Sequence, residues 1–485
     1  MASQQKDNVK NLPFWLITIG IIIVLTLPIL VKDGMFMDAM LYTSVAHNLS
    51  QGIGTFWFPQ FSYNNMSGLT SFHEQPSLGL GIQACFFKLF GSGMYTERIY
   101  TFLMLVMAVW LIVLLWKEIY RSDNELQKQA WLPLLLWITI PVCYWSYCNN
   151  MMENTMNIFV LPAVLFSYRS CKANKDVIVY VFLSGLCIFL ASLTKGLPGL
   201  FPIVIPFIYW LTIGNITFRR VFTATLILVG IPLLLYSLLM LYPESKDSLT
   251  IYFTKRVLGR IQNEPVVSSR LSILWQLFMN MLPQLGLAAI VLIIAKRKQI
   301  RTEGIYQKTG LFFVITGLAG TLPLMATLVQ KGFYMVPALP YFAIGLAMYM
   351  GPYTKELVET ISNQRNMYRI ISIAGIVILC FSLGFTISQI GKTSRNKELL
   401  HDVYAIGKIV PDHSVVAIPN NSDMWNEWDL QCYLMRYYNI SIDPNKPHIF
   451  YVDNVNHHGQ LPEKYKLVAH LEQYDLFKED SVRVK

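Results

Sequence analysis

Long runs of apolar residues alternate with short polar segments along most of the chain. A transmembrane helix needs about 20 predominantly apolar residues to cross a hydrocarbon core of about 30 Å. Eleven segments meet this pattern and are predicted to span a membrane: 13–31, 99–116, 130–148, 154–168, 177–193, 197–214, 221–242, 271–295, 309–329, 332–351 and 370–391. The apolar stretch 77–90 is shorter and rich in glycine, so we expect an interfacial or re-entrant segment there.

The pattern changes after the last apolar segment. About 26% of residues 392–485 are charged, against about 11% of residues 1–391. Segments that alternate or run apolar with β-branched and aromatic residues are typical of strands, and the spacing of 428–438 predicts a helix. The predicted strands are 414–419, 447–453, 466–471 and 474–477. We therefore predict a mainly α fold, with a multi-span membrane domain over 1–391 and a small α/β extracytoplasmic domain over 392–485.

The composition excludes an ordinary soluble enzyme. The chain is 54% hydrophobic and only 14% charged, whereas a soluble domain carries about 25% charged residues. Its net charge of +10 follows membrane topology, so no nucleic-acid partner is expected. With a cytoplasmic N-terminus, 18 Lys and Arg residues fall in inner segments and 10 in the longer outer loops, as the positive-inside rule requires. Eleven spans then place the C-terminal domain outside a cell (inner) membrane.

The first long outer loop, 32–98, carries candidate catalytic acids. Asp38, Tyr42 and Ala46 are spaced i, i+4, i+8, which places them on one face of a short helix on the outer surface of the membrane. Glu74 precedes a proline and the glycine-rich apolar run. Carboxylates at a membrane boundary are costly and tend to mark function.

Three further acids on the outer side are interpreted differently. Asp33 and Glu97 flank the first loop, and we expect both to be solvated acids at the boundary. Glu153 lies in a very short outer loop before an apolar segment. It is either a functional acid or a residue that stabilises the start of a helix.

Four basic residues stand on the outer side against the topology rule: Lys195, Arg256, Arg260 and Lys331. Arg256 and Arg260 are four residues apart, which places them on one helical face. Such cations suit a lipid-linked phosphate, because they bind phosphate oxygens and stabilise the charge of a leaving group. Contact with lipid headgroups is the alternative, and it carries equal weight for Arg256.

The motifs of the first loop resemble those of a known family. D-x-x-x-Y-x-x-x-A from Asp38, F-x-E-x-P-x-L around Glu74, and L-F-G followed by E-R resemble the type C glycosyltransferases. The branch they resemble most contains the aminoarabinose transferases and the dolichyl-phosphate-mannose protein mannosyltransferases. Glu153, Lys195–Gly196 and the segment 334–340 after Lys331 extend the resemblance over roughly residues 10–350.

This resemblance implies an inverting glycosyltransferase with a polyprenyl-phosphate sugar donor. It implies that Asp38 is the base or positions the acceptor, and that Glu74 and Glu153 are further acids of the site. Arg260 would contact the donor phosphate and Tyr334 would line the donor groove. Two positions depart from the pattern: Ala39 follows Asp38 where many members have Glu, and Gln75 stands where the aminoarabinose branch has Lys.

The predicted site combines the residues and the resemblance. Asp38, Glu74 and Glu153 are the catalytic candidates. Arg260, Arg256, Lys195 and Lys331 are the candidates for the donor phosphate, and Tyr42, Tyr334 and Gln75 for the substrate groove. The expected acceptor is a hydroxyl group on a lipid, glycan or protein. The residues require no cofactor, although Glu74 and Glu153 could hold a divalent metal.

Two other functions compete with the transferase. A transporter or flippase of lipid-linked sugars should show internal repeats and broken spans in matching halves. The sequence shows no such repeat, and its acids cluster on one side. A ligase or polymerase would carry its long catalytic loop late in the chain.

Overall fold

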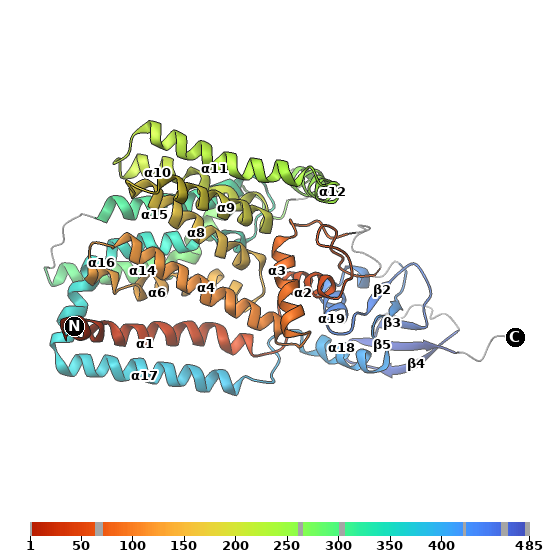
Figure 1. Ribbon diagram of the computed structural model, residues 1–485. Coiled ribbons are helices and arrows are strands. Elements are labelled where there is room, and N and C mark those ends of the chain that lie inside the picture. Colours follow the sequence, from red (N-terminus) through yellow and green to blue (C-terminus); the bar gives the residue numbers. More distant parts are fainter. Residues whose placement is uncertain are drawn as a thin grey trace. The chain divides into compact units, whose positions relative to one another are not determined.

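The computed structural model describes residues 2–63, 71–259, 265–299, 306–420, 423–456 and 464–480, with side chains from residue 10 onward. It confirms a mainly α chain with a small C-terminal sheet (Figure 1). The chain divides into two compact units. The first comprises Met1–Leu30, Thr101–Cys148 and Met152–Ile390, and the second comprises Val31–Tyr100, Asn149–Met151 and Gly391–Lys485. The second unit thus contains the first long loop as well as the tail; the domain boundary at 391/392 stays a prediction.

The described part of the first unit is built of helices. These are α1 (Ala2–Leu30), α4 (Thr96–Ile119, which starts in the second unit), α5 (Asn124–Gln127), α6 (Trp131–Ile138), α7 (Pro141–Cys148), α8 (Met152–Lys172), α9 (Val177–Lys195), η1 (Leu197–Val204), α10 (Ile205–Thr212), α11 (Phe218–Leu239), α12 (Pro243–Ile251), η2 (Tyr252–Leu258), α14 (Ser272–Arg297), α15 (Gln307–Thr321), η4 (Leu322–Ala326), η5 (Gly332–Met335), α16 (Leu339–Asn363) and α17 (Arg365–Ser388). Every predicted apolar segment overlaps at least one of them.

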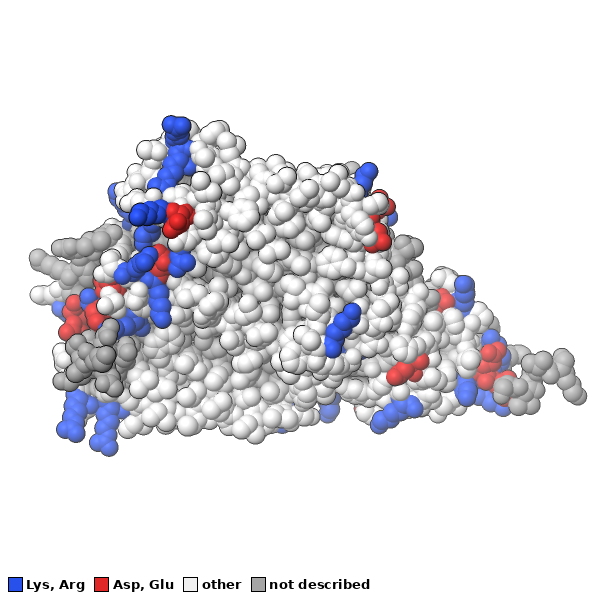
Figure 2. All heavy atoms as spheres, in the orientation of Figure 1, with Lys and Arg blue, Asp and Glu red and all other residues white. Residues whose placement is uncertain are grey.

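The predicted number of spans is not confirmed. Within the described residues, seven helices are long and apolar enough to cross a membrane. An eighth candidate is a broken one, because 124–138 and α7 meet at an angle of 84°. The break falls before Pro141, which has no N–H to continue the helical hydrogen bonds. Figure 2 shows Lys and Arg side chains gathered at the end of the first unit where α1 begins, next to a wide surface with hardly any charge.

Helices α1 and α17 pack along each other through small residues. A Cβ on Gly20 would lie 2.7 Å from Cγ2 of Ile378, and the hydroxyl of Ser382 donates to the carbonyl of Gly20 at 2.8 Å. On the facing helix, a Cβ on Gly375 would lie 3.0 Å from Cβ of Leu16. Close backbone approach of this kind is a common way for apolar helices to associate.

The second unit combines helices with a five-stranded sheet. Its elements are α2 (Met37–Ser50), α3 (Leu78–Phe90), α18 (Lys397–Ile409), β1 (Val415–Ala417), η6 (Asp423–Asn426), α19 (Trp428–Tyr438), β2 (Ser441–Asp443), β3 (Phe450–Asn454), β4 (Tyr465–His470) and β5 (Tyr474–Glu479). The strand order is β2-β1-β3-β5-β4, parallel over the first three strands and antiparallel at β5 and β4. The predicted strands and the helix over 428–438 are confirmed, whereas α18 and β2 were not predicted.

A buried ionic network joins the first loop to the tail within this unit. Arg98 contacts the carboxylate of Asp33 at 3.0 Å and that of Glu97 at 3.2 Å. Arg436 of α19 contacts the other oxygen of Glu97 at 2.7 Å. The hydroxyl of Tyr437 donates to Asp33 at 2.8 Å. Asp33 and Glu97 are 8% and 0% exposed, so the prediction that they are solvated acids was wrong.

Backbone contacts strengthen the same junction. The N–H of Asp33 donates to the carbonyl of Lys392 at 2.8 Å, and the N–H of Ser394 donates to the carbonyl of Asp33 at 2.7 Å. Nearby, the ring of His47 lies 2.9 Å from the hydroxyl of Ser92, whose carbonyl accepts from Arg436. Burial, with the charge of Arg436 as the second cause, lowers the pKa of His47 to about 3. We infer that His47 is neutral in the folded protein.

Gly20→Ala should destabilise the first unit, because its methyl group must displace Ile378. Gly384→Ala is the matched control: it lies on α17, no described atom is within 4 Å of its added Cβ, and alanine is the better helix former by about 1 kcal/mol. Thermal unfolding of the detergent-purified variants measures both changes. Equal melting temperatures for the two variants would contradict the close contact.

Acidification should weaken the second unit through His47. Because its pKa is lowered on folding, the unfolded chain binds a proton between about pH 6.5 and pH 3 that the folded chain does not. The contribution of His47 to the free energy of unfolding is therefore complete above pH 6.5. It falls by about 1.4 kcal/mol per pH unit below that pH. His47→Gln should remove this part of the slope of melting temperature against pH between pH 7 and 5. An unchanged slope would show that His47 is not the group responsible.

Candidate active site

The first predicted acid lies at the start of α2. Asp38 is in the first turn of the helix and is partly exposed. A carboxylate in this position is favoured by the positive end of the helix dipole. Tyr42, one turn later, is 6% exposed and Ala46 is fully buried, so the predicted helix over these residues is confirmed. The helix packs against α3 and α19, and the hydroxyl of Ser44 donates to the carbonyl of Cys432 at 3.0 Å.

The segment with Glu74 returns to the same helix. Glu74 is partly exposed and Gln75 is 3% exposed, in the irregular chain that leads into α3. Phe72 lies edge-on to the ring of Tyr42, with ring centroids 6.3 Å apart. His73 is held by the hydroxyl of Ser71 at 3.0 Å. The second unit therefore holds Asp38, Tyr42, Glu74 and Gln75 on neighbouring segments.

The first unit pairs two of the other predicted residues. Glu153 lies in the first turn of α8 and Lys195 is the last residue of α9, which packs along α8. Their ammonium and carboxylate groups are 3.3 Å apart, with side-chain exposures of 11% for Lys195 and 2% for Glu153. Each charge also suits the dipole of its own helix end. The sequence did not predict this pairing, because the residues are 42 positions apart.

Gly196, the residue after Lys195, allows another segment to approach the end of α9 closely. Gly196 has φ +83°, and a Cβ there would overlap the hydroxyl of Tyr252. Tyr252 begins η2, a π-helix that also contains Arg256. Segments of π-helix are rare and frequent at functional sites. Sequence reasoning missed Tyr252, although it precedes Arg256 by four residues.

The helical face that Arg256 was predicted to share with Arg260 is described only at Arg256. It is partly exposed, and its spacing to Arg260 assumed an α-helix, whereas η2 has the wider turn of a π-helix. Arg260 lies outside the described residues.

Lys331 and Tyr334 belong to the first unit as well. Tyr334 is in η5, which packs against α7 and α14, and Lys331 directly precedes it. The ammonium of Lys331 lies 5.6 Å from the ring centroid of Phe333, which stacks on Trp145. Lys331 and Tyr334 are both partly exposed, and the ring of Phe333 offers the ammonium group a cation–π contact.

Solved structures share this arrangement of elements. The crystal structure of ArnT from Cupriavidus metallidurans bound to undecaprenyl phosphate matches with a TM-score of 0.66 and 13% identity, over 96% of this chain and 98% of that one. Its apo state matches with a TM-score of 0.62 and 13% identity, over 95% of each chain. The Archaeoglobus fulgidus oligosaccharyltransferase in complex with Zn and sulfate matches with a TM-score of 0.50 and 13% identity, over 90% of this chain and 68% of that one. This chain has a type C glycosyltransferase fold.

The likeness lies in the structure and not in the sequence. No protein-family model matches the chain, and no curated protein matches it. At 13% identity the fold alone is shared. A type C glycosyltransferase fold nevertheless accounts for both units, because ArnT matches over nearly its whole length.

The described residues form no cluster of possible metal ligands. Among them, no three His, Cys, Asp or Glu side chains are grouped so that they could hold an ion. The carboxylate of Glu153 faces the ammonium of Lys195 instead of further acids. Glu153, which was one of two predicted metal ligands, therefore already has its charge balanced by a side chain.

Lys195→Met should destabilise the first unit strongly. Among the described residues, neither carboxylate oxygen of Glu153 accepts a hydrogen bond, so its charge depends on Lys195. Removing one partner of a buried ion pair costs about 3–5 kcal/mol. The double variant Lys195→Met with Glu153→Gln should recover most of the loss, because no charge remains uncompensated. Thermal unfolding of the purified variants tests this, and a double variant no more stable than the single one would contradict the pairing.

Proposed function

We propose that this protein is a membrane glycosyltransferase that moves a sugar from a polyprenyl-phosphate donor to an acceptor hydroxyl at the outer face of the membrane. The observation that carries the proposal is the fold. It matches ArnT over 98% of that chain, and that crystal contains undecaprenyl phosphate. Of the residues selected from the sequence, Asp38, Glu153, Lys195 and Arg256 lie on helices of this fold.

Asp38 would activate the acceptor. Its position in the first turn of α2 stabilises the charged carboxylate, which a base requires. The carboxylate takes the proton of the acceptor hydroxyl while the oxygen bonds to the anomeric carbon. The bond from that carbon to the phosphate oxygen breaks, and polyprenyl phosphate leaves with the electron pair. Attack opposite the leaving group inverts the anomeric centre.

The basic residues would stabilise the phosphate that leaves. An ammonium group has three donors, so Lys195 can contact Glu153 and a phosphate oxygen together. In this scheme Glu153 orients Lys195. Arg256, Arg260 and Lys331 would complete the phosphate site, and preorganised cations of this kind stabilise developing charge.

The remaining predicted residues would shape the substrate groove. Tyr42 and Gln75 are buried in the second unit, and Tyr334 lies among the aromatic residues around Lys331. Glu74, close in sequence to the Phe72 contact with Tyr42, would assist Asp38 in orienting the acceptor.

The proposed orientation follows the charges of the first unit. Lys and Arg gather at the end where α1 begins (Figure 2), and positively charged loops are retained in the cytoplasm. We therefore propose an integral inner-membrane protein with a cytoplasmic N-terminus, and with its site and tail outside.

Asp38→Asn should abolish transfer, because an amide cannot accept the proton; a general base contributes about 10²–10⁴-fold to the rate. The measurement is mass spectrometry of envelope glycans, lipids and glycoproteins from wild type, a deletion strain, and the deletion complemented with each variant. One sugar should disappear from one acceptor in the deletion and remain absent with Asp38→Asn.

Asp412→Asn is the matched control, since this acid of the same unit is exposed and should restore the sugar. Protein levels must be equal in both strains. Full restoration by Asp38→Asn would remove Asp38 as the base. Accumulation of lipid-linked sugar on the inner side, with no sugar missing from any acceptor, would instead favour a transporter.

A further inference from the structure

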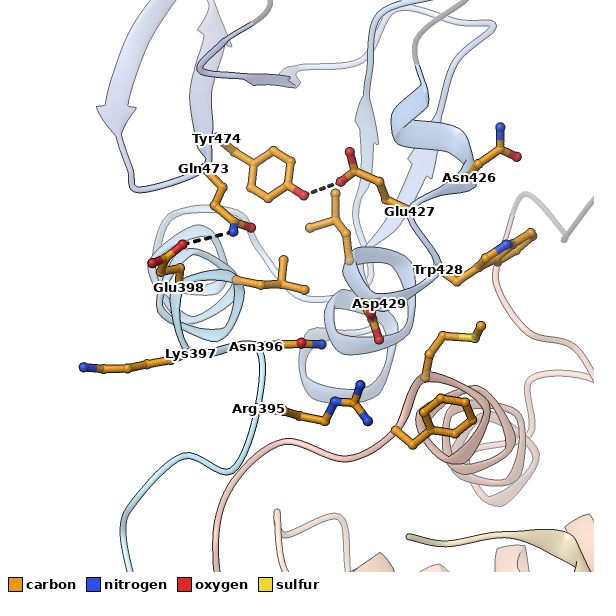
Figure 3. Close-up of a pocket in the computed structure, with 14 residues that line it drawn as sticks. Arg395, Asn396, Lys397, Glu398, Asn426, Glu427, Trp428, Asp429, Gln473 and Tyr474 are labelled. Atoms are coloured by element: carbon orange, nitrogen blue, oxygen red, sulfur yellow. Dashed lines mark hydrogen bonds between the residues drawn. The ribbon is translucent and has the colours of Figure 1, made fainter. Parts of the chain in front are cut away.

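The second unit contains a pocket of about 590 Å³ that none of the roles above uses (Figure 3). Its volume is within the range of small-molecule sites. The starts of three helices contribute to its wall: α2, α18 and α19, together with Gln473 and the first residue of β5, Tyr474. Phe36 and Met37, which belong to this wall, directly precede Asp38.

Two pairs of side chains form a fixed polar rim. The hydroxyl of Tyr474 donates to the carboxylate of Glu427, and the amide of Gln473 donates to Glu398 at 3.3 Å. Figure 3 shows both bonds on the same side of the pocket. These acids are therefore already engaged by neutral donors of the protein.

Two buried polar atoms in the wall have no hydrogen-bond partner among the described residues. They are Oδ1 of Asp429, an acceptor, and Nδ2 of Asn396, a donor. Figure 3 shows both side chains beside Arg395. Burial raises the pKa of Asp429, the charge of Arg395 and the adjacent side chain of Asn396 lower it, and the charge of Asp38 raises it. A hydroxyl group both donates and accepts, so one ligand hydroxyl could satisfy both atoms.

The pocket also offers an aromatic surface. Trp428 is partly exposed, and among the described residues its ring stacks on no other ring and its N–H donates to no acceptor. Indole combines a flat apolar face with one polar donor, which suits a ligand with both apolar C–H faces and hydroxyl groups. The guanidinium of Arg395 is held 5.4 Å from the ring centroid of Phe36.

The charge of the wall argues against an anion. Three carboxylates line the pocket against two cations, and Lys397 points away from the other labelled side chains (Figure 3). A phosphate would meet Glu398, Glu427 and Asp429 with only Arg395 in reach. An uncharged ligand avoids this repulsion.

We propose that this pocket binds an uncharged saccharide, which is the acceptor of the transfer, stacked on Trp428 and hydrogen-bonded to Asp429 and Asn396. Only the role of the saccharide as the acceptor rests on the proposed function. The saccharide would be bound next to the helix turn that carries Asp38, so one of its hydroxyl groups could be presented to that carboxylate.

The test observes the pocket directly in the full-length protein. The chain has 11 Trp residues, and 5-fluorotryptophan labelling gives each a ¹⁹F resonance, with that of Trp428 assigned through Trp428→Phe. The probes are the methyl glycosides of glucose, galactose, mannose, N-acetylglucosamine and arabinose. Each is titrated to about 50 mM, at which a site with a Kd of about 10 mM is mostly occupied.

We expect at least one glycoside to shift the Trp428 resonance and to leave that of Trp425, a nearby residue outside the pocket wall, unchanged. Asp429→Asn should weaken this binding by about tenfold, and Trp428→Phe, followed through tyrosine fluorescence quenching, should retain it because the aromatic face remains. Trp425→Phe is the matched control for folding and should bind like wild type. No shift with any glycoside, or equal shifts at Trp425 and Trp428, would overturn the proposal.

The outcome is separable from that of the proposed function. If glycosides bind at Trp428 but deletion of the gene changes no envelope sugar, the saccharide site stands and the transferase fails. If deletion removes a sugar and Trp428→Ala restores it fully, the transferase stands and the pocket is not its acceptor site.

Discussion

The buried network around Arg98 is the constraint on which the second unit depends. Arg98 and Arg436 alternate with Asp33 and Glu97, and every charge in this set has an opposite charge within 3.2 Å. Buried ion pairs are weak contributors to stability, because desolvation offsets their attraction. Their geometry is nevertheless demanding, since any other pairing of the segments would leave a charge without a partner. The network therefore specifies which segment of the loop meets which segment of the tail.

The positions of the candidate residues on α2 depend on this junction between the loop and the tail. Helix α2 begins three residues after Gly34, whose position is fixed by the strand-like contact of Asp33 with Lys392 and Ser394. Its other end carries His47, beside the loop that Arg436 holds. Asp38 and the wall of the pocket proposed to bind a saccharide thus depend on a helix fixed at both ends. In the first unit, Glu153 and Lys195 are fixed by the packing of α8 on α9.

Much of the architecture could be predicted from local pattern. The apolar segments, the helix from Asp38 to Ala46 and the strands of the tail follow from the periods of helix and strand, which act over neighbouring residues. The number of spans could not be predicted as well, because one segment is broken before Pro141 and the apolar helix over 197–212 is too short to count as a span. The acids Asp33 and Glu97 were misjudged, since their partners are set by tertiary packing. The pairing of Glu153 with Lys195 and the approach of Tyr252 to Gly196 also depend on contacts between distant segments.

The composition of the second unit has a consequence for the order of synthesis. Residues 31–100 are made before the helices from α5 to α17, but the tail that completes their unit begins at Gly391. Arg98 and Glu97 must therefore wait for Arg436 while almost all helices of the first unit are made. Domains generally fold as units, the N-terminal ones first, during synthesis. The second unit differs because its segments lie on both sides of the first unit in the sequence. A nascent chain that ends before Gly391 has every catalytic candidate and still has no completed partner for the loop that carries Asp38. The loop that carries Asp38 can therefore assemble only after the helices of the first unit have been made.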